Sequence, residues 1–236
     1  MSLPPITPTQ ESRTTSRLNF DYLTLRKTLG ILGLALPVAL IIGNDFTIEP
    51  SISHYYYTSM IVVFTGILFA FGLVLMAYRG FPTEENEMMS DNLITNLAGG
   101  LAILVAIIPT SGEIGSEGVP NFHESDVINA IHLGFAGMFI CLMGYMSVFQ
   151  FTKEKKQLSD PSLNFTQAEV NRIVKRVNLY RICGVLIWLS VAYIALAKYV
   201  GFNLTGADTF WGETVALICF GIAWLVKSKA LSKVGL

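Results

Sequence analysis

The sequence predicts an all-α, polytopic membrane protein with six transmembrane helices in a compact bundle. The chain of 236 residues is 52% apolar and only 14% charged, and its mean hydropathy is +0.53. That composition is too apolar for a soluble domain of this size. The chain also contains six separate windows that are nearly free of charge. Each approaches the roughly 20 residues that a helix needs to cross the hydrocarbon core of a bilayer.

The six windows define the expected helices in order. The second and fourth contain no Asp, Glu, Lys or Arg, and the sixth carries Glu213 in its first turn. We expect a transmembrane domain over residues 26–228, between a mobile cytoplasmic tail at 1–25, rich in Pro, Thr and Ser, and a short cytoplasmic tail at 229–236. The helices are expected at residues 28–46, 55–78, 92–109, 127–151, 179–200 and 210–227.

Basic residues predict the orientation of the bundle. Lys and Arg near helix ends stay on the cytoplasmic side. Six spans place fifteen of the sixteen Lys and Arg on one side, with Lys198 as the exception, and the opposite loops are acidic. Both termini are therefore expected to be cytoplasmic. We interpret the basic segment from Lys153 to Arg176 as ordinary anchoring, rather than as a specific site for an anionic lipid.

Polar residues gather on the outer half of the predicted bundle. Asp126, Asn129 and His132 follow one another at intervals of three, which brings successive side chains close together on a helix. An ionisable group inside a membrane should face other helices or a water-filled cavity. We therefore expect an outward-facing pocket for a lipid headgroup or a small polar ligand. The candidate residues are Ser53, His54, Tyr55, Tyr56, Tyr57, Asp126, Asn129, His132 and Glu213.

A structural role is the alternative for each of these residues. The tyrosines can belong to an interfacial aromatic belt, and the histidines can form hydrogen bonds between helices. A membrane accessory protein without a ligand is therefore also compatible with the pattern.

The histidines raise the question of a metal. All three in the chain, His54, His123 and His132, fall on the outer side, and with Asp126 they supply the ligand types of a zinc site. Zinc-bound water can act as the nucleophile of a hydrolase, here one acting on a lipid amide or ester. However, no HxxxH or HExxH pair occurs. We therefore expect no cofactor and no enzymatic activity, with a zinc hydrolase as the alternative.

A small-solute transporter is a further alternative. Such proteins often carry internal repeats with matching interruptions of their helices at the midplane. Pro37 is the only clear interior breaker in the six windows, and no repeat is visible.

Membrane lipids are the expected partners and an oligomer is compatible with the sequence, whereas no nucleic-acid signature occurs. Small residues on the third helix, Ala98, Ala102 and Ala106, should let helices approach closely.

Two short motifs resemble those of a known family. Pro50-Ser-Ile-Ser-His-Tyr-Tyr-Tyr ahead of the second helix, and Ile107-Ile-Pro109-Thr at the end of the third, are similar to motifs of an uncharacterised bacterial six-helix membrane family. That family is distantly akin to the DRAM and FGF-receptor-activating-protein group. The resemblance implies a compact bundle in a bacterial inner membrane, without an agreed activity. It carries over to Ser53, Pro109 and His132.

A second similarity is narrower. Through Ser53 and His54 the chain resembles the seven-helix metal-dependent hydrolases that include the alkaline ceramidases. It departs from that family in having six predicted helices and no terminal HxxxH. The departure removes the metal ligands on which the activity of that family depends.

Overall fold

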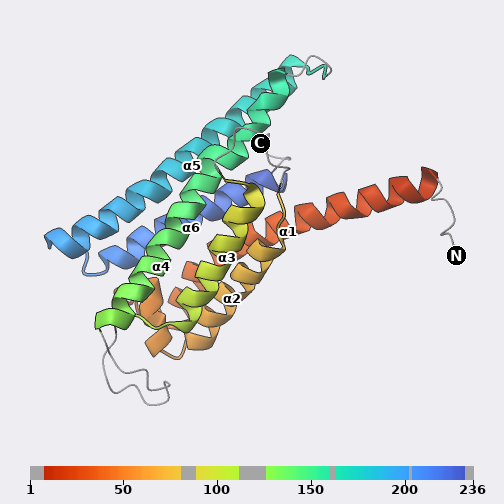
Figure 1. Ribbon diagram of the computed structural model, residues 1–236. Helices are drawn as coiled ribbons and strands as arrows, with labels where there is room; N and C mark the ends of the chain where they lie inside the picture. Colours follow the sequence, from red (N-terminus) through yellow and green to blue (C-terminus); the bar gives the residue numbers. More distant parts are fainter. Residues whose placement is uncertain (1–7, 81–88, 112–125, 160–162, 202–203, 232–236) are drawn as a thin grey trace, which may run out of the picture.

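The computed structural model describes residues 8–80, 89–111, 126–159, 163–201 and 204–231, and in these residues the chain is helical, with no strand. Six α-helices lie side by side (Figure 1). A short turn, η1, precedes α2, and α4 continues through a π-helical turn, η2, into a 3-10 segment, η3. The α-helices are α1 (Pro8–Gly43), α2 (Ile61–Ala77), α3 (Asp91–Ile107), α4 (Asp126–Tyr145), α5 (Gln167–Val200) and α6 (Asp208–Lys227), and the shorter segments are η1 (Ile52–Tyr57), η2 (Met146–Gln150) and η3 (Phe151–Ser159).

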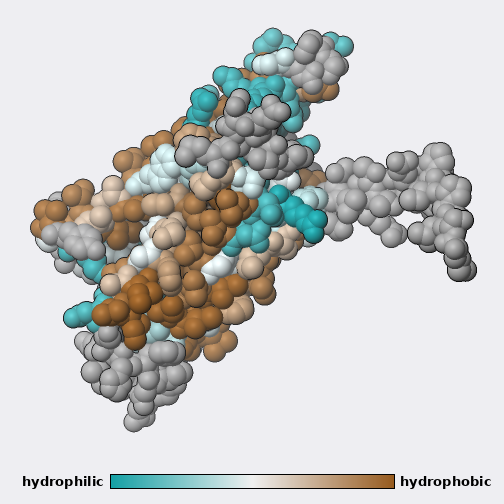
Figure 2. Space-filling view, viewed as in Figure 1, coloured by the Kyte–Doolittle hydropathy of each residue, from teal (hydrophilic) through white to brown (hydrophobic). Residues whose placement is uncertain are grey.

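The helices fit a membrane bundle in length and in surface chemistry. Four are long and apolar enough to cross a bilayer, at Tyr22–Gly43, Asp126–Ser159, Gln167–Lys198 and Asp208–Lys227, and α2 and α3 are shorter but also apolar. Large apolar side chains face outward on all six α-helices, and Val62 is 74% exposed. Figure 2 shows these side chains as a broad apolar surface over the body of the molecule, with polar residues towards the ends. Lipid chains are the natural environment of such a surface.

α6 is the central helix of the bundle. In its span 56% of the residues are buried, against 22–33% in the other three long spans. It packs between α1 and α5 and also contacts α4. The closest helix approaches occur at glycines. A Cβ atom added to Gly30 would lie 2.9 Å from the carbonyl oxygen of Gly221, and one added to Gly72 would lie 2.7 Å from that of Gly99. Small residues allow such backbone contact between membrane helices.

The N-terminal segment differs from the expected mobile tail. α1 begins at Pro8, so most of the segment 1–25 is helical, and Figure 1 shows this half of α1 projecting away from the other helices. Proline suits the first turn of a helix because its missing N–H is not needed there. The Gln, Glu and Arg residues that follow are good helix formers.

The second predicted helix is divided in two by Thr58. We expected one helix over 55–78, but η1 ends at Tyr57 and α2 starts at Ile61. The Thr58 hydroxyl donates to the carbonyl oxygen of Tyr55 (3.0 Å) and accepts from the N–H of Met60 (3.1 Å), while its backbone is extended. Local bonds of this kind compete with the helical ladder. As a result the three tyrosines lie in the short turn η1, which precedes α2 in the chain.

Candidate functional site

Side chains from η1 and α4 hold the end of α3. The Tyr57 hydroxyl donates to the carbonyl oxygen of Thr110 (2.6 Å). Asn129 Oδ1 accepts from the hydroxyl of Thr110 and from the N–H of Ser111, both at 3.1 Å. Polar groups at a helix end have no partner within the helix and need one elsewhere. Tyr57 and Asn129, both predicted pocket residues, therefore act here as structural partners of α3.

His132 links three elements. Its Nδ1 lies 2.5 Å from the carbonyl oxygen of Ile108, directly after α3, and its Nε2 lies 2.9 Å from the hydroxyl of Ser53 in η1. A carbonyl only accepts hydrogen bonds, so Nδ1 carries the proton, and Nε2 of the neutral ring accepts the hydrogen of Ser53. The His132 side chain is 1% exposed. The three-residue spacing thus brings His132 and Asn129 to the same place, the end of α3.

The Ser53–His132 bond has the form that activates a serine nucleophile. Ser53 borders an apolar cavity in the middle of the bundle, of about 40 Å³. At about 10–15 Å³ per water, that space holds roughly three waters and leaves no room for a lipid amide or ester. We therefore interpret the bond as a structural link between η1 and α4.

His54 follows Ser53 in η1 and has a different partner. Its Nδ1 is 2.7 Å from the hydroxyl of Ser51, and the ring is half-buried. Burial lowers the pKa of His54 below its usual 6.5, and the positive charge of Lys198 lowers it further. The neutral ring is thus the favoured form at neutral pH.

The remaining predicted residues divide between core and surface. Tyr55 is fully buried and its hydroxyl donates to the carbonyl oxygen of Thr47 (3.0 Å). Tyr56 is also buried, against the ring of Tyr57. Asp126 is exposed at the first residue of α4. These tyrosines pack and bond within the bundle instead of lining an open pocket.

No three His, Cys, Asp or Glu side chains come together as metal ligands within the part of the chain that the structure describes. His54, His132 and Asp126 belong to that part, whereas His123 lies outside it. The zinc alternative therefore stays a prediction.

Glu213 is the predicted site residue that borders two cavities. Its Oε2 accepts a hydrogen bond from the N–H of Ile52 (2.6 Å). Together with Ala136 and Ile140, Glu213 lines both the central cavity and an outer cavity of about 150 Å³ between α4, α5 and α6. Lys198 of α5 and Thr209 of α6 also line the outer cavity, and its other walls are apolar. This volume is several times what one water needs.

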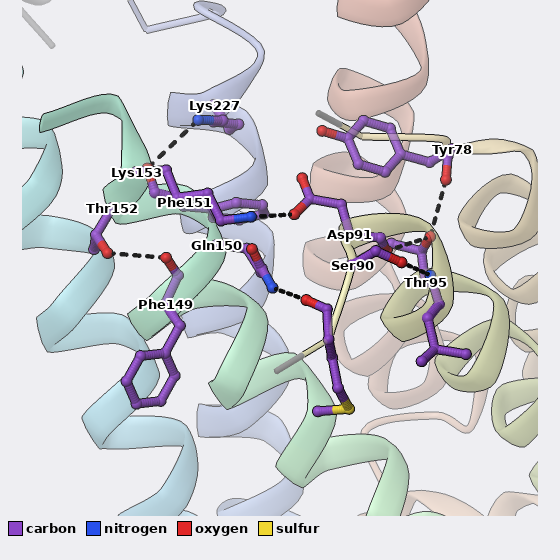
Figure 3. A network of polar contacts seen from close by, with 12 residues as sticks. Tyr78, Ser90, Asp91, Thr95, Phe149, Gln150, Phe151, Thr152, Lys153 and Lys227 are labelled. Carbon is purple, nitrogen blue, oxygen red and sulfur yellow. Dashed lines mark hydrogen bonds and ion pairs between the residues drawn. The ribbon is translucent and has the colours of Figure 1, made fainter. Parts of the chain in front are cut away.

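A second polar cluster lies at the opposite end of the bundle, where the sequence suggested Arg79 as the partner of Asp91. Asp91, at the start of α3, pairs with Lys153 of η3 at 3.0 Å, and the two side chains are 2% and 14% exposed. Figure 3 shows Lys153 pointing at Asp91, and Lys227 pointing at the carbonyl oxygen of Phe151. The ammonium of Lys227 lies 3.5 Å from the carbonyl oxygen of Phe151. In the sequence, Asp91 is an acidic residue at an end of the bundle that carries many basic ones. The sequence alone does not identify which basic residue pairs with it.

Comparison with known proteins gives no relative. No family model matches the chain, and no curated protein or solved structure matches it either. The resemblances described above stay predictions, and the function has to be argued from the geometry alone.

Proposed function

We propose that this chain is a multi-pass protein of the cell membrane, with six spans and both termini in the cytoplasm, that binds the headgroup of an amphiphile in the outer cavity. Six apolar α-helices support the number of spans. A contact between Arg26, near the start of the apolar span of α1, and the carbonyl oxygen of Lys227 at the end of α6 (3.5 Å) supports a basic end. Lys198 and Glu213 share a cavity near the other end.

The observation that carries the binding function is the lining of that cavity. It combines one acidic and one basic side chain, Glu213 and Lys198, with mostly apolar walls from α4 and α5. A zwitterionic headgroup matches this arrangement, with its ammonium beside Glu213, its phosphate beside Lys198 and the first part of its chains along the apolar wall. Charge-assisted hydrogen bonds of this kind are the strong ones.

The carboxylate of Glu213 is also oriented by a hydrogen bond within the protein. The hydrogen bond from Ile52 fixes one carboxylate oxygen and thereby orients the other. A carboxylate removed from bulk water needs partners for its lone pairs. A bound ammonium group supplies such a partner, and it also fills space that otherwise forfeits packing contacts.

A titration of the full chain in detergent with dioleoyl phosphatidylethanolamine, followed by native mass spectrometry, tests the proposal. Glu213→Gln keeps an oxygen for Ile52 but loses the charge, so we expect binding at least about tenfold weaker. Asp126→Asn removes an exposed acid from α4 at the same end and should bind as the wild type does. Equal affinity for all three proteins would overturn the proposal.

A further inference from the structure

A cavity near the basic end lies outside the site described so far. It has a volume of about 620 Å³ and lies between the end of α4, η2, η3 and α5, with Met89 ahead of α3 also lining it. Gln150 helps to shape its wall, because its side-chain amide donates to the carbonyl oxygen of Met89 (2.8 Å) and ties η2 to the chain ahead of α3. π-helical turns such as η2 are frequent at functional sites.

The polar lining of this cavity is strongly basic. Lys153, Lys155 and Lys156 come from η3, and Arg181 comes from α5. Among the residues that the structure describes, no Asp or Glu lines it. Asp91 already neutralises Lys153, whereas Lys155 and Arg181 are exposed and converge from two different elements. Such a concave, basic surface attracts an anion with several oxygen atoms.

The apolar part of the lining indicates an anion with a hydrocarbon tail. Tyr145 and Phe149 line the cavity beside the lysines, and Phe149 is 50% exposed. Directly after Arg181, the exposed apolar side chains Ile182 and Leu189 follow α5 towards the middle of the bundle. In Figure 2 polar residues at this end adjoin the apolar surface. Arg and aromatic residues at such a boundary suit a lipid whose charge lies at the interface.

From this arrangement we infer that the cavity is a specific binding site for the phosphate-bearing headgroup of an anionic phospholipid. The phosphate binds between Lys155 and Arg181, and the acyl chains extend along Phe149 and the exposed face of α5. The site is distinct from the outer cavity in position and in charge, since the outer cavity offers one carboxylate and one ammonium group. It also goes beyond general attraction of basic loops to acidic lipid, because only a few of the basic residues line it.

The decisive comparison uses two double variants of the full chain with equal charge. Arg181→Gln with Lys155→Gln removes two cations from the cavity. Arg172→Gln with Lys175→Gln removes two exposed cations of α5 that do not line it. Native mass spectrometry of the detergent-solubilised proteins during titration with dioleoyl phosphatidylglycerol gives the affinities. Dioleoyl phosphatidylcholine, a zwitterion with no net charge, is the reference lipid, and glycerol 3-phosphate is the free phosphate ester.

We expect the cavity variant to bind phosphatidylglycerol about tenfold more weakly or worse. The control variant should stay within about threefold of the wild type, as should phosphatidylcholine binding by all proteins. An equal loss in both variants would mean that diffuse charge alone attracts the lipid and would refute the site. Binding of glycerol 3-phosphate as tight as that of the lipid would instead refute a lipid as the occupant. Thermal melting of each variant checks that the fold persists.

Discussion

His132 uses both of its ring nitrogens inside the protein, on Ile108 and on Ser53. A buried side chain with two protein partners stabilises its surroundings, and it has no atom left to offer a ligand. Glu213 differs, because its known bond goes to a single backbone N–H and its side chain borders two cavities. At the scale of residues, the predicted cluster therefore separates into structural members around His132 and a candidate binding residue at Glu213.

Replacing His132 should test the structural role. His132→Ala leaves the carbonyl oxygen of Ile108 and the hydroxyl of Ser53 without this partner in an apolar interior. We expect the free energy of unfolding to fall by about 1 kcal/mol or more. Thermal melting in detergent measures the change, and Asp126→Ala, an exposed position on the same helix, is the control. A melting temperature of His132→Ala equal to that of the control would contradict the role.

His54 should make stability depend on pH. Folding lowers its pKa below the unfolded value of about 6.5, so the folded state binds this proton less readily than the unfolded state. The stability contributed by the neutral ring is therefore present above about pH 6.5 and is lost as the pH falls through the lowered pKa. The melting temperature of the wild type should drop more between pH 7.5 and pH 5 than that of His54→Gln. Equal changes in melting temperature with pH for the two proteins would contradict this role of His54.

At the scale of elements, the bundle depends on backbone contact between α2 and α3. A Cβ atom on Gly99 would lie 2.6 Å from the carbonyl oxygen of Gly72, a contact that cannot be relieved by moving a side chain. The sequence suggested Ala98, Ala102 and Ala106 for this role, and all three are buried. The closest approach falls on the neighbouring glycine, which the spacing of small residues alone did not single out.

Adjacent glycines provide a matched pair for the element scale. Gly99→Ala should destabilise the protein, because α2 and α3 must move apart. Gly100→Ala meets no atom within 4 Å and should be neutral or stabilising, since alanine favours the helix by up to about 1 kcal/mol. Melting temperatures in detergent that differ in this direction would support the contact. A stabilised Gly99→Ala protein would contradict it.

The sequence predicted where most of the α-helices lie, but it identified few of the residues that line the cavities between them. Charge-free windows located the apolar α-helices, because a membrane span must be apolar over its whole length. A helix that is apolar on all faces shows only weak periodicity of hydrophobic residues. The sequence therefore does not show which face of such a helix points inward. The walls of the outer cavity, such as Ala136 and Ile194, could therefore not be predicted. The break at Thr58 depends on one side-chain hydrogen bond and was missed for a similar local reason.

At the scale of the whole molecule, the two ends of the bundle differ in chemistry. One end joins Arg26, Lys153 and Lys227 from three helical segments around Asp91 and the carbonyl groups of the helix ends. The other end carries Glu213, Lys198, His54 and His132. Since basic residues are retained in the cytoplasm, this polarity relates the two proposed sites to the two membrane surfaces. In the proposed orientation, the proposed anionic-lipid site faces the cytoplasmic leaflet and the proposed zwitterionic site faces the opposite leaflet.

Cysteine labelling in intact cells tests that orientation. In a variant with Cys141, Cys183 and Cys219 replaced by alanine, a single cysteine is introduced either by Lys155→Cys in η3 or by Thr205→Cys ahead of α6, both at exposed positions. A membrane-impermeant maleimide should label Thr205→Cys from outside, and it should label Lys155→Cys only after permeabilisation, because the proposed orientation places the basic end in the cytoplasm. The reverse pattern would invert the protein in the membrane and exchange the leaflets of the two sites. Labelling of both positions from outside would rule out an up-and-down bundle that spans the bilayer, since η3 and the turn before α6 lie at opposite ends of α5.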